Sequence, residues 1–224
     1  NAFSMASDSS IHDESIQAQK YANYLETSHY STYMTSNNSI EALDRAVASA
    51  GEPFGDYSII PTWQVSKIAK EKVTVVLSGD GGDELFFGYD RFRSIGKNHS
   101  FWHYPYWIRY GLRGLDKLIF NEKHINECIL APNPGTSHRG LHCRFPINWL
   151  NQIAPNLIHT DIPSLFDIYN YSNPSSQEEL LYNIRKAEFY GMLQKTLTKV
   201  DKASMAHGLE VRVPLLKKSL VESI

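Results

Sequence analysis

The residues of this chain that are best suited to chemistry gather in one short turn. The turn combines Ser78 and several glycines with three carboxylates, Asp80, Asp83 and Glu84. Glycines let a backbone approach a ligand closely, and free N–H groups bind phosphate oxygens. The carboxylates alone would repel a polyphosphate, so the turn predicts a divalent cation between the two. Mg²⁺ suits this position because it binds one or two carboxylates together with phosphate oxygens.

The turn matches neither of two widespread phosphate-binding patterns. It lacks the Gly-Lys-Ser/Thr of a P-loop and the GxGxxG spacing of dinucleotide-binding folds. A purely structural interpretation also stays open. In that case Asp83 and Glu84 only complement a helix dipole, and the glycines only make the turn.

The elements around the turn predict an α/β fold. Val73–Leu77 is a β-branched run before the turn and an apolar stretch follows it, which indicates a buried strand, a turn and a helix start. Ligands of open α/β sheets bind at this place. Upstream, helical and strand patterns alternate, so we expect a three-layer, doubly wound parallel sheet. The predicted elements are a helix at 13–25, a strand at 29–34, a helix at 38–50 and a helix from Pro61 to Ala69.

The apolar positions of these helices predict which faces are buried. The expected faces are Ala18, Tyr21, Ala22 and Leu25 in the first helix, Ile40, Leu43, Val47 and Ala50 in the second, and Val65, Ile68 and Ala69 in the third.

Residues 97–175 carry weaker signals. Arg109, Arg113 and Lys117 recur at helical spacing, and we expect a solvated cationic stripe with Ile108, Leu112, Leu115 and Ile119 packed inward. A basic surface for a membrane or nucleic acid is the alternative. Segments 131–135 and 171–176 are expected turns. His138 and His142 lie four residues apart, but Gly140 separates them and the surroundings look loop-like, so no metal-ligand role is expected.

A second informative segment runs from Ser175 to Leu216. Ser176 and Glu179 have the spacing of a capping box, and the apolar positions from Leu180 to Val200 predict one long, largely buried helix. Gly208 suits a helix end. Glu210 and Arg212 then fall on one face of an extended segment, where they can pair.

Composition excludes several classes of protein. The 224 residues are 42% hydrophobic with a net charge of −2, which gives no bulk electrostatic case for nucleic acid or an anionic membrane. Cys128 and Cys143 form no CxxC pair, which favours a reducing, cytoplasmic compartment. No apolar run approaches the ~20 residues of a membrane span. The chain begins at Asn1 without signal-peptide features, and we expect a piece of a longer protein.

Three motifs together resemble the synthetase domain of glutamine-hydrolysing asparagine synthetases. They are Ser78-Gly-Asp-Gly-Gly-Asp-Glu-Leu-Phe-Phe-Gly-Tyr89, Lys199-Val-Asp-Lys-Ala-Ser-Met-Ala-His-Gly-Leu-Glu-Val-Arg-Val-Pro214, and Gly51-Glu-Pro-Phe-Gly-Asp-Tyr-Ser-Ile-Ile-Pro-Thr62. Asp13-Glu14 and His29 fit the family's opening helix and second strand. The resemblance implies an ATP-pyrophosphatase fold like that of adenine nucleotide alpha-hydrolases. It implies an α/β nucleotide-binding part at about 1–96 and a mainly helical part at about 97–224.

The resemblance also implies a reaction and its participants. The parent enzyme would adenylate the side-chain carboxylate of aspartate with ATP and Mg²⁺, and ammonia from a glutaminase domain of the same chain would capture the adenylate to give asparagine. The small-molecule partners would be aspartate and ammonia. No nucleic acid or membrane partner is implied, and a homodimer stays open.

Residue roles are carried over in the same way. Ser78 and Gly79 would contact ATP, and Asp80 would be the catalytic acidic residue of adenylate formation. Asp83 would hold Mg²⁺ on the pyrophosphate, and Asp56 and Ser58 would lie near the substrate pocket. Lys202 would meet phosphate or pair with Glu210.

Several departures from the family pattern leave alternatives open. The pyrophosphate loop Ser-Gly-Gly-x-Asp-Ser and the glutaminase cysteine are absent, Phe86-Phe87 replaces part of Phe-Gly-Gly, and Pro214-Leu-Leu replaces Pro-Phe-Leu-Asp. We therefore expect residues 1–224 alone to make no asparagine and to bind ATP weakly. The acceptor could also be another carboxylate, such as a β-lactam precursor or a surface-polysaccharide sugar. A non-catalytic interaction domain is the alternative from another class.

Overall fold

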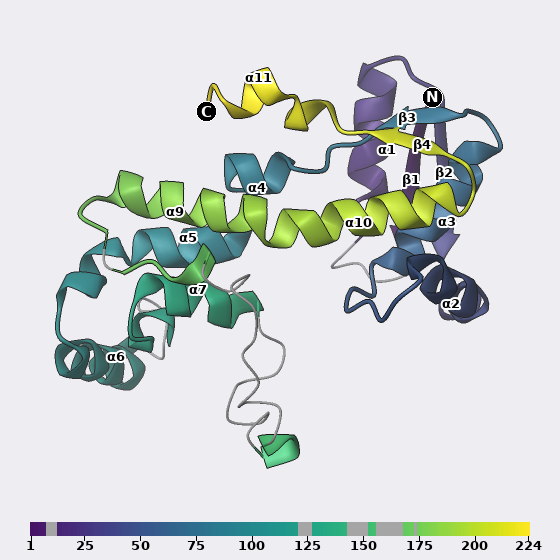
Figure 1. Ribbon diagram of the computed structural model, residues 1–224. Helices are drawn as coiled ribbons and strands as arrows, with labels where there is room; N and C mark the ends of the chain where they lie inside the picture. The colour runs from purple at the N-terminus through teal and green to yellow at the C-terminus, as the bar shows by residue number, and fades with distance from the viewer. Residues whose placement is uncertain (8–12, 121–126, 143–151, 156–167, 173) are drawn as a thin grey trace. The chain divides into compact units, whose positions relative to one another are not determined.

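The computed structural model describes residues 1–7, 13–120, 127–142, 152–155, 168–172 and 174–224 (Figure 1). The chain divides into two compact units. Unit 1 comprises Asn1–Asp80 and Lys195–Glu222, and unit 2 comprises Gly81–Gln194 with Ser223–Ile224. The expected division near residue 96 placed the segment from Lys195 onward in the helical part. In the structure this segment belongs to unit 1, together with the N-terminal part of the chain.

Unit 1 is a mixed α/β unit with small parallel sheets. Its elements are β1 (Ala2–Ser7), α1 (Ser15–Tyr24), β2 (His29–Met34), α2 (Ser36–Ala50), α3 (Ile59–Lys70), β3 (Val75–Leu77), most of α10 (Met192–Met205), β4 (Glu210–Arg212), η5 (Pro214–Leu216) and α11 (Lys218–Val221).

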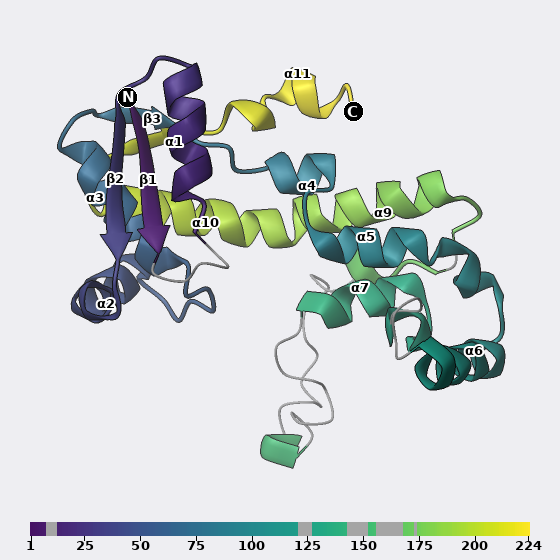
Figure 2. The ribbon, with the colours of Figure 1, turned by 180° about the vertical axis from the view of Figure 1, so that it is seen from behind.

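The strands of unit 1 form two parallel pairs. β1 runs beside β2 from Ala2 opposite His29 to Ser7 opposite Met34 (Figure 2). β3 runs beside β4, with Val75 opposite Glu210 and Leu77 opposite Arg212. The described residues therefore show two separate two-stranded sheets, while the prediction was one doubly wound sheet.

The predicted helix at 38–50 exists, but its buried face is not the expected one. α2 begins after Thr35, whose side chain and that of Asn38 form a reciprocal capping box, and it ends at Gly51, which has a φ of 74°. Ala42, Ala46 and Ala50 are buried, whereas Ile40, Leu43 and Val47 are exposed. The small alanines make room for Ile59 and Trp63 of α3 in a common core cluster.

Other predictions for unit 1 are confirmed in part. β2 has the predicted bounds, and Pro61 lies in the first turn of α3. In α1 only Ala22 is buried, whereas Tyr21 and Leu25 are exposed. In α3 Ala69 is buried, but Ile59, Trp63 and Ser66 take the other buried positions, and Val65 and Ile68 do not. The strand before the glycine-rich turn is not buried, since Leu77 is 72% exposed.

Unit 2 is helical in its described part. Its elements are α4 (Gly82–Phe86), α5 (Asp90–Lys97), η1 (His99–His103), α6 (Tyr106–Phe120), η2 (Glu127–Leu130), α7 (Pro134–His142), α9 (Gln177–Tyr190) and the start of α10. Phe92 and Ile95 of α5 pack against Leu180 and Ile184 of α9 in its core.

The predicted long helix is divided into α9 and α10. Ser176 caps α9 and accepts a hydrogen bond from the Glu179 N–H at 3.1 Å. The Glu179 carboxylate accepts from Ser175 in place of the Ser176 backbone, so the capping box is half formed. Gly191 ends α9 with φ −106° and ψ −86°, outside the helical region. Its position is crowded, because a Cβ there would lie 2.7 Å from the Ala187 carbonyl oxygen.

The expected orientation of α6 is wrong. Arg109 and Arg113 are 5% and 8% exposed, whereas Leu115 and Ile119 are more than half exposed. The Arg109 guanidinium turns inward because it donates to the carbonyl oxygens of Tyr104, Ile129 and Ala131. These bonds offset the cost of burying the charge. A solvated cationic stripe is therefore not present on this helix.

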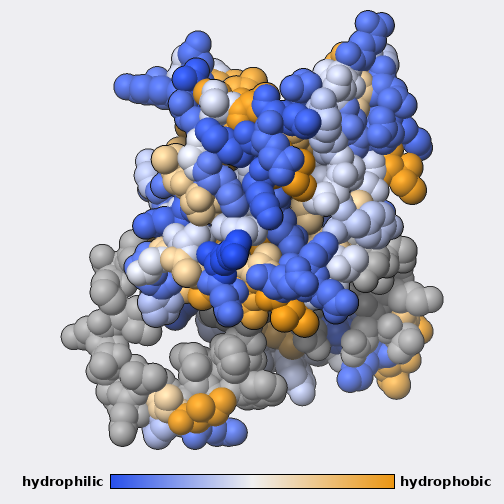
Figure 3. Space-filling view, turned by 90° about the vertical axis from the view of Figure 1, so that its right-hand side faces the viewer, coloured by the Kyte–Doolittle hydropathy of each residue, from blue (hydrophilic) through white to orange (hydrophobic). Residues whose placement is uncertain are grey.

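Within the described ranges, no helix combines the length and the apolar character that crossing a bilayer requires. Hydrophilic side chains cover most of the face shown in Figure 3, and the apolar ones form scattered patches on it.

Candidate functional site

The glycine-rich turn begins where the β3–β4 ladder ends. The Ser78 N–H donates to the Arg212 carbonyl oxygen at 2.9 Å, which continues the ladder by one residue beyond Leu77. The two motifs noticed in the sequence are therefore neighbours in space, since Arg212 belongs to the second one. Their pairing fixes the position of Ser78 at the carboxyl end of β3.

Ser78, Gly79 and Asp80 line a cavity of about 770 Å³ in unit 1. The Ser78 hydroxyl donates to the Asp80 carboxylate, and the Asp80 N–H returns a longer hydrogen bond of 3.3 Å to the Ser78 Oγ. A Cβ built at Gly79 would meet nothing within 4 Å among the described residues. Packing therefore does not require a glycine at this position, whereas the close approach of a ligand would.

The cavity has a mixed lining. Residues of β1, α3, β3 and β4 supply most of its apolar side chains, and Ser78, Asp80 and Lys199 are among its polar residues. Its volume lies within the range of small-molecule sites, about 300–1,000 Å³. Such a lining fits an amphipathic ligand with an apolar ring and an anionic tail, which is the chemistry of a nucleotide.

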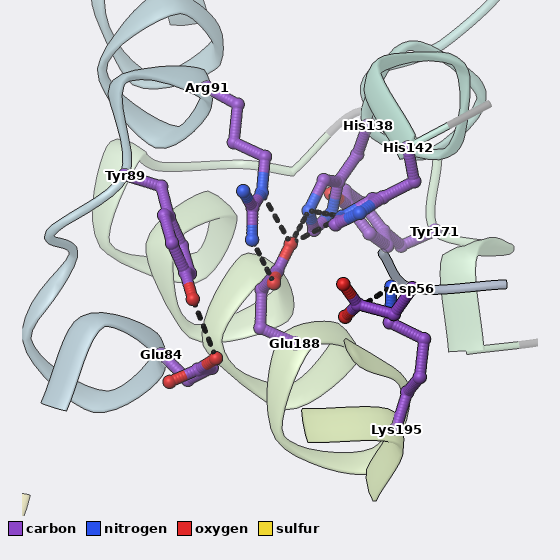
Figure 4. A network of polar contacts seen from close by, with 9 residues as sticks. All are labelled: Asp56, Glu84, Tyr89, Arg91, His138, His142, Tyr171, Glu188 and Lys195. Atoms are coloured by element: carbon purple, nitrogen blue, oxygen red, sulfur yellow. Dashed lines mark hydrogen bonds and ion pairs between the residues drawn. The ribbon is translucent and has the colours of Figure 1, made fainter. Parts of the chain in front are cut away.

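Asp56 and Ser58 form a polar network at the start of α3. The Ser58 hydroxyl donates to Asp56 Oδ1 at 2.6 Å, and the Ser58 N–H donates to the same oxygen at 3.0 Å. Asp56 Oδ2 lies 3.3 Å from the Lys195 Nζ (Figure 4). Burial alone would raise the pKa of Asp56, but the Ser58 hydrogen bonds and the nearby lysine charges hold the pKa below its usual value.

Lys199 joins this network to the cavity. Its Nζ donates to the Ser58 Oγ at 3.0 Å, and the residue also lines the cavity beside Ser78–Asp80. The structure therefore brings five predicted site residues into one region of unit 1: Asp56, Ser58, Ser78, Gly79 and Asp80. The lysine that joins them was not among the predicted residues.

The sequence does contain a signal for Lys199. Lys195, Lys199 and Lys202 follow each other at i, i+4 and i+7, which places them along one side of a helix. Lys202, the lysine that was predicted, is exposed and is not in the lining of this cavity. Glu210 pairs with Arg212 at 2.7 Å, as the extended segment predicted.

The remaining carboxylates of the turn belong to unit 2. Gly81 has a φ of 88°, a conformation that requires glycine, and α4 follows it directly. Glu84 is buried and accepts a hydrogen bond from the Tyr89 hydroxyl at 2.9 Å. Burial makes the largest contribution to raising the pKa of Tyr89, and the negative charge of Glu84 raises it further. Glu84 thus has a structural partner.

Asp83 is exposed, whereas Glu84 is buried. A Cβ at Gly88 would collide with the Asp83 carboxylate, so the glycine at 88 gives this side chain its space. An exposed carboxylate in the first turn of a helix is available to a cation or to the helix dipole. Both interpretations of Asp83 therefore stay open.

Unit 2 contains a second polar network that the sequence did not reveal. His138 and His142 lie one turn apart on α7, so the expectation of loop-like surroundings is wrong. Their Nε2 atoms lie 2.5 and 2.6 Å from Glu188 Oε1. The Arg91 Nη2 lies 2.8 Å from Oε2 of the same carboxylate (Figure 4). Glu188 and His138 are fully buried.

Comparison with known proteins shows which family the chain belongs to. The chain belongs to the asparagine synthase family, whose model matches residues 1–224. This confirms the resemblance noticed in the three motifs.

Individual relatives carry corresponding names. A putative asparagine synthetase (glutamine-hydrolyzing) 2 of Methanocaldococcus jannaschii is 45% identical over 78 residues, which cover 35% of this chain and 15% of the relative. The asparagine synthetase (glutamine-hydrolyzing) 1 of Bacillus subtilis is 30% identical over 79% of this chain and 28% of its own length. A putative asparagine synthetase (glutamine-hydrolyzing) of Mycobacterium bovis is 27% identical over 84% of this chain and 29% of its own length. The chain thus spans less than a third of these relatives.

Proposed function

We propose that this domain belongs to an ATP-dependent ligase that forms an amide from a carboxylate and ammonia. One observation carries the proposal: Ser78, Gly79, Asp80 and Lys199 share a cavity whose lining suits a nucleotide. The family and the names of the relatives support the same reaction class. Aspartate is the carboxylate that those names favour, and ammonia would come from glutamine hydrolysed elsewhere in the complete protein.

The reaction needs an anionic nucleophile close to an anionic phosphorus. A carboxylate oxygen attacks the α-phosphorus of ATP, pyrophosphate leaves, and ammonia then displaces AMP from the acyl-adenylate. Electrostatic repulsion opposes the first step unless positive groups cancel charge while the geometry is held fixed. Lys199 is a cation in the cavity lining itself, and its bond to Ser58 holds it in place.

We assign roles to the turn residues accordingly. Ser78 and the backbone of Gly79 contact the nucleotide, and Asp80 acts next to the reacting carboxylate. When nitrogen attacks, a carboxylate at Asp80 orients the amine or accepts its proton. Asp83 fits a Mg²⁺ ligand because it is an exposed carboxylate beside the turn, and Mg²⁺ would cancel charge on the pyrophosphate.

We also propose that the two strand pairs belong to one doubly wound sheet of the complete protein. β1 and β3 each pair with a neighbour on one side only in the described part of the chain, so each has a free edge to which a further parallel strand can add. One such strand that pairs with both edges would join the two pairs into one sheet. Slower amide exchange of β1 and β3 in the full-length protein than in residues 1–224 would support this arrangement.

A substrate-dependent ATP–pyrophosphate exchange assay on the full-length protein tests the proposed reaction. Exchange that depends on aspartate is the expected result, and exchange with another carboxylate would redefine the acceptor. Absence of exchange with every carboxylate, in a folded protein, would contradict the proposed function and favour a non-catalytic domain.

Two lysine variants test the assignment of the cavity. Lys199→Ala should lower the exchange rate strongly, because it removes the cation of the cavity lining. Lys67→Ala is the matched control, since Lys67 is an exposed lysine of α3 that is not in the lining. Equal exchange rates for the two variants would mean that the nucleotide lies elsewhere.

A further inference from the structure

The network around Glu188 has the donor atoms of a metal site. Among the residues that the structure describes, His138, His142 and Glu188 are the one group of three His, Cys, Asp or Glu side chains whose ligand atoms all lie within 4.8 Å of one another. α7 supplies the histidines at i and i+4, and α9 supplies the carboxylate. Two imidazoles with one carboxylate are a frequent ligand set for Zn²⁺.

The two imidazole nitrogens have the spacing that such an ion requires. With metal–ligand bonds of about 2.0–2.1 Å, two corners of a tetrahedron lie about 3.3 Å apart. The Nε2 atoms of His138 and His142 are 3.4 Å apart. Glu188 Oε1 lies 2.5 and 2.6 Å from them, which is hydrogen-bond spacing, so an ion would displace this oxygen outward by about 0.7 Å.

Hydrogen bonds alone leave this arrangement overcrowded. Glu188 Oε1 faces the Nε2 atoms of both histidines and also the Arg91 Nε at 3.2 Å. A carboxylate oxygen has two lone pairs, so three N–H donors exceed what it can accept well. If both histidines donated, two N–H groups would also face each other across 3.4 Å. A cation between the nitrogens replaces both protons and removes this conflict.

The surroundings resemble the outer shell of a metal site. The Tyr171 hydroxyl lies 2.9 Å from the His138 Nδ1, where it can orient the ring, and Arg91 holds the second oxygen of Glu188. Such partners fix the orientation of metal ligands and tune their affinity. The His142 side chain is 17% exposed, so one edge of the group is open to solvent, from which an ion and a water ligand can enter.

We propose that His138, His142 and Glu188 bind one divalent transition-metal ion, with Zn²⁺ the best-suited ion, and that the ion links α7 to α9. The inference does not rest on the proposed ligase activity, because it concerns side chains of unit 2 that have no part in the assignment of the cavity.

Metal titration of the full-length protein tests the site. The protein is stripped with a chelator, dialysed, and titrated with Zn²⁺ in a calorimeter and with Co²⁺ in a spectrophotometer. Four-coordinate Co²⁺ absorbs visible light much more strongly than hydrated Co²⁺, so the band reports the geometry. The expected result is a saturable site with one ion per chain, an intense Co²⁺ band, and a higher melting temperature with Zn²⁺.

Matched variants decide where the ion binds. His142→Ala should abolish the Co²⁺ band and the thermal shift, whereas His103→Ala should keep both, since His103 belongs to another histidine pair that lies four residues apart. Tyr171→Phe leaves all three ligands in place and should weaken binding about tenfold.

Two results would overturn the proposal. One is the absence of a Co²⁺ band and of a thermal shift in the unmodified protein, which would mean that the network is held by hydrogen bonds only. The other is binding that survives in His142→Ala. If circular dichroism shows that His142→Ala is unfolded, Tyr171→Phe decides the question, because unchanged affinity in that variant would place the ion elsewhere.

Discussion

The cavity of unit 1 and the Glu188 network of unit 2 hold their polar groups in opposite ways. Ser78 and Asp80 are two residues apart, lie beside open space, and bond mainly to each other. Glu188 is fully buried and bonds to side chains of two other helices, one of them 97 residues away in the sequence. The first arrangement leaves its groups beside open space, and the second crowds them against one another inside unit 2.

This difference explains why only one of the two regions was visible in the sequence. A contiguous motif such as Ser78–Glu84 can be recognised without knowledge of the fold. The Glu188 network depends on packing α5, α7 and α9 together, and neither Arg91 nor Glu188 stands in a pattern that singles it out. A contiguous motif can therefore be recognised in the sequence, whereas a dispersed network needs the structure.

The largest effect is expected at the cavity. In the full-length protein, Asp80→Ala should lower adenylate formation by about 10²-fold or more, the size of effect expected when a group that positions the reactants is lost. The melting temperature and glutamine hydrolysis should change little, because Asp80 follows a glycine and adds little packing. ATP–pyrophosphate exchange measures the effect. Full exchange activity, or an unfolded variant, would show that the turn has a structural role only.

The second effect concerns stability and should appear in unit 2. Glu188→Gln leaves Arg91 without its charged partner, and breaking a buried ion pair by removing one member costs about 3–5 kcal/mol. Urea unfolding of the metal-free protein measures this loss. Glu178→Gln is the control, because Glu178 is an exposed residue at the start of the same helix. If both variants were equally stable, the ion pair between Arg91 and Glu188 would contribute nothing to the free energy of unfolding.

Much of the local structure could be predicted, and several of the errors have a common cause. β2, the cap at Ser176 and the turn after β3 follow from local rules of hydrogen bonding and backbone conformation. Several wrong predictions concern which face of a helix is buried, and two examples are α2 and α6. Alanines pack inward on α2 and arginines on α6, because the neighbouring elements supply Trp63 in one case and backbone carbonyls in the other. Periodicity alone does not contain this information.

The candidate site shows the same limit. Ser78, Gly79 and Asp80 were found because they are contiguous. Lys199 was missed because its significance depends on α10 lying beside Ser58, which is 141 residues away in the sequence. Lys202 was chosen from the same helix and lies outside the cavity lining.

A third prediction separates the two interpretations of Asp83. If Asp83 binds Mg²⁺, Asp83→Asn should raise the Mg²⁺ concentration needed for half-maximal exchange, by on the order of tenfold, because a neutral amide is a weaker ligand. Asp90→Asn is the control, since Asp90 is an exposed carboxylate in the first turn of α5. An unchanged Mg²⁺ midpoint with a stability loss of only about 0.3–1 kcal/mol would favour the dipole interpretation.

The smallest effect should come from Asp56, and it should depend on pH. The folded-state pKa of Asp56 is below its usual value, so its ionised form stabilises the folded protein at pH values above the unfolded pKa. This stabilisation is lost as the pH falls through the folded pKa, because the carboxyl is then protonated in both states. Asp56→Asn keeps an oxygen that accepts from Ser58 but loses the attraction to Lys195 and Lys199. We therefore expect a loss of about 1 kcal/mol at pH 7 that vanishes in strong acid.

Chemical unfolding of Asp56→Asn from pH 7 down to about pH 3 measures this dependence, within the range where carboxylates titrate. Asp44→Asn serves as the control, because Asp44 is an exposed carboxylate of α2. A difference between Asp56→Asn and the unmodified protein that stays constant with pH would mean that the charge of Asp56 is not what stabilises this network. Its neighbours Ser58 and Lys199 would then hold their positions through their own hydrogen bond and the packing of α10 against α3.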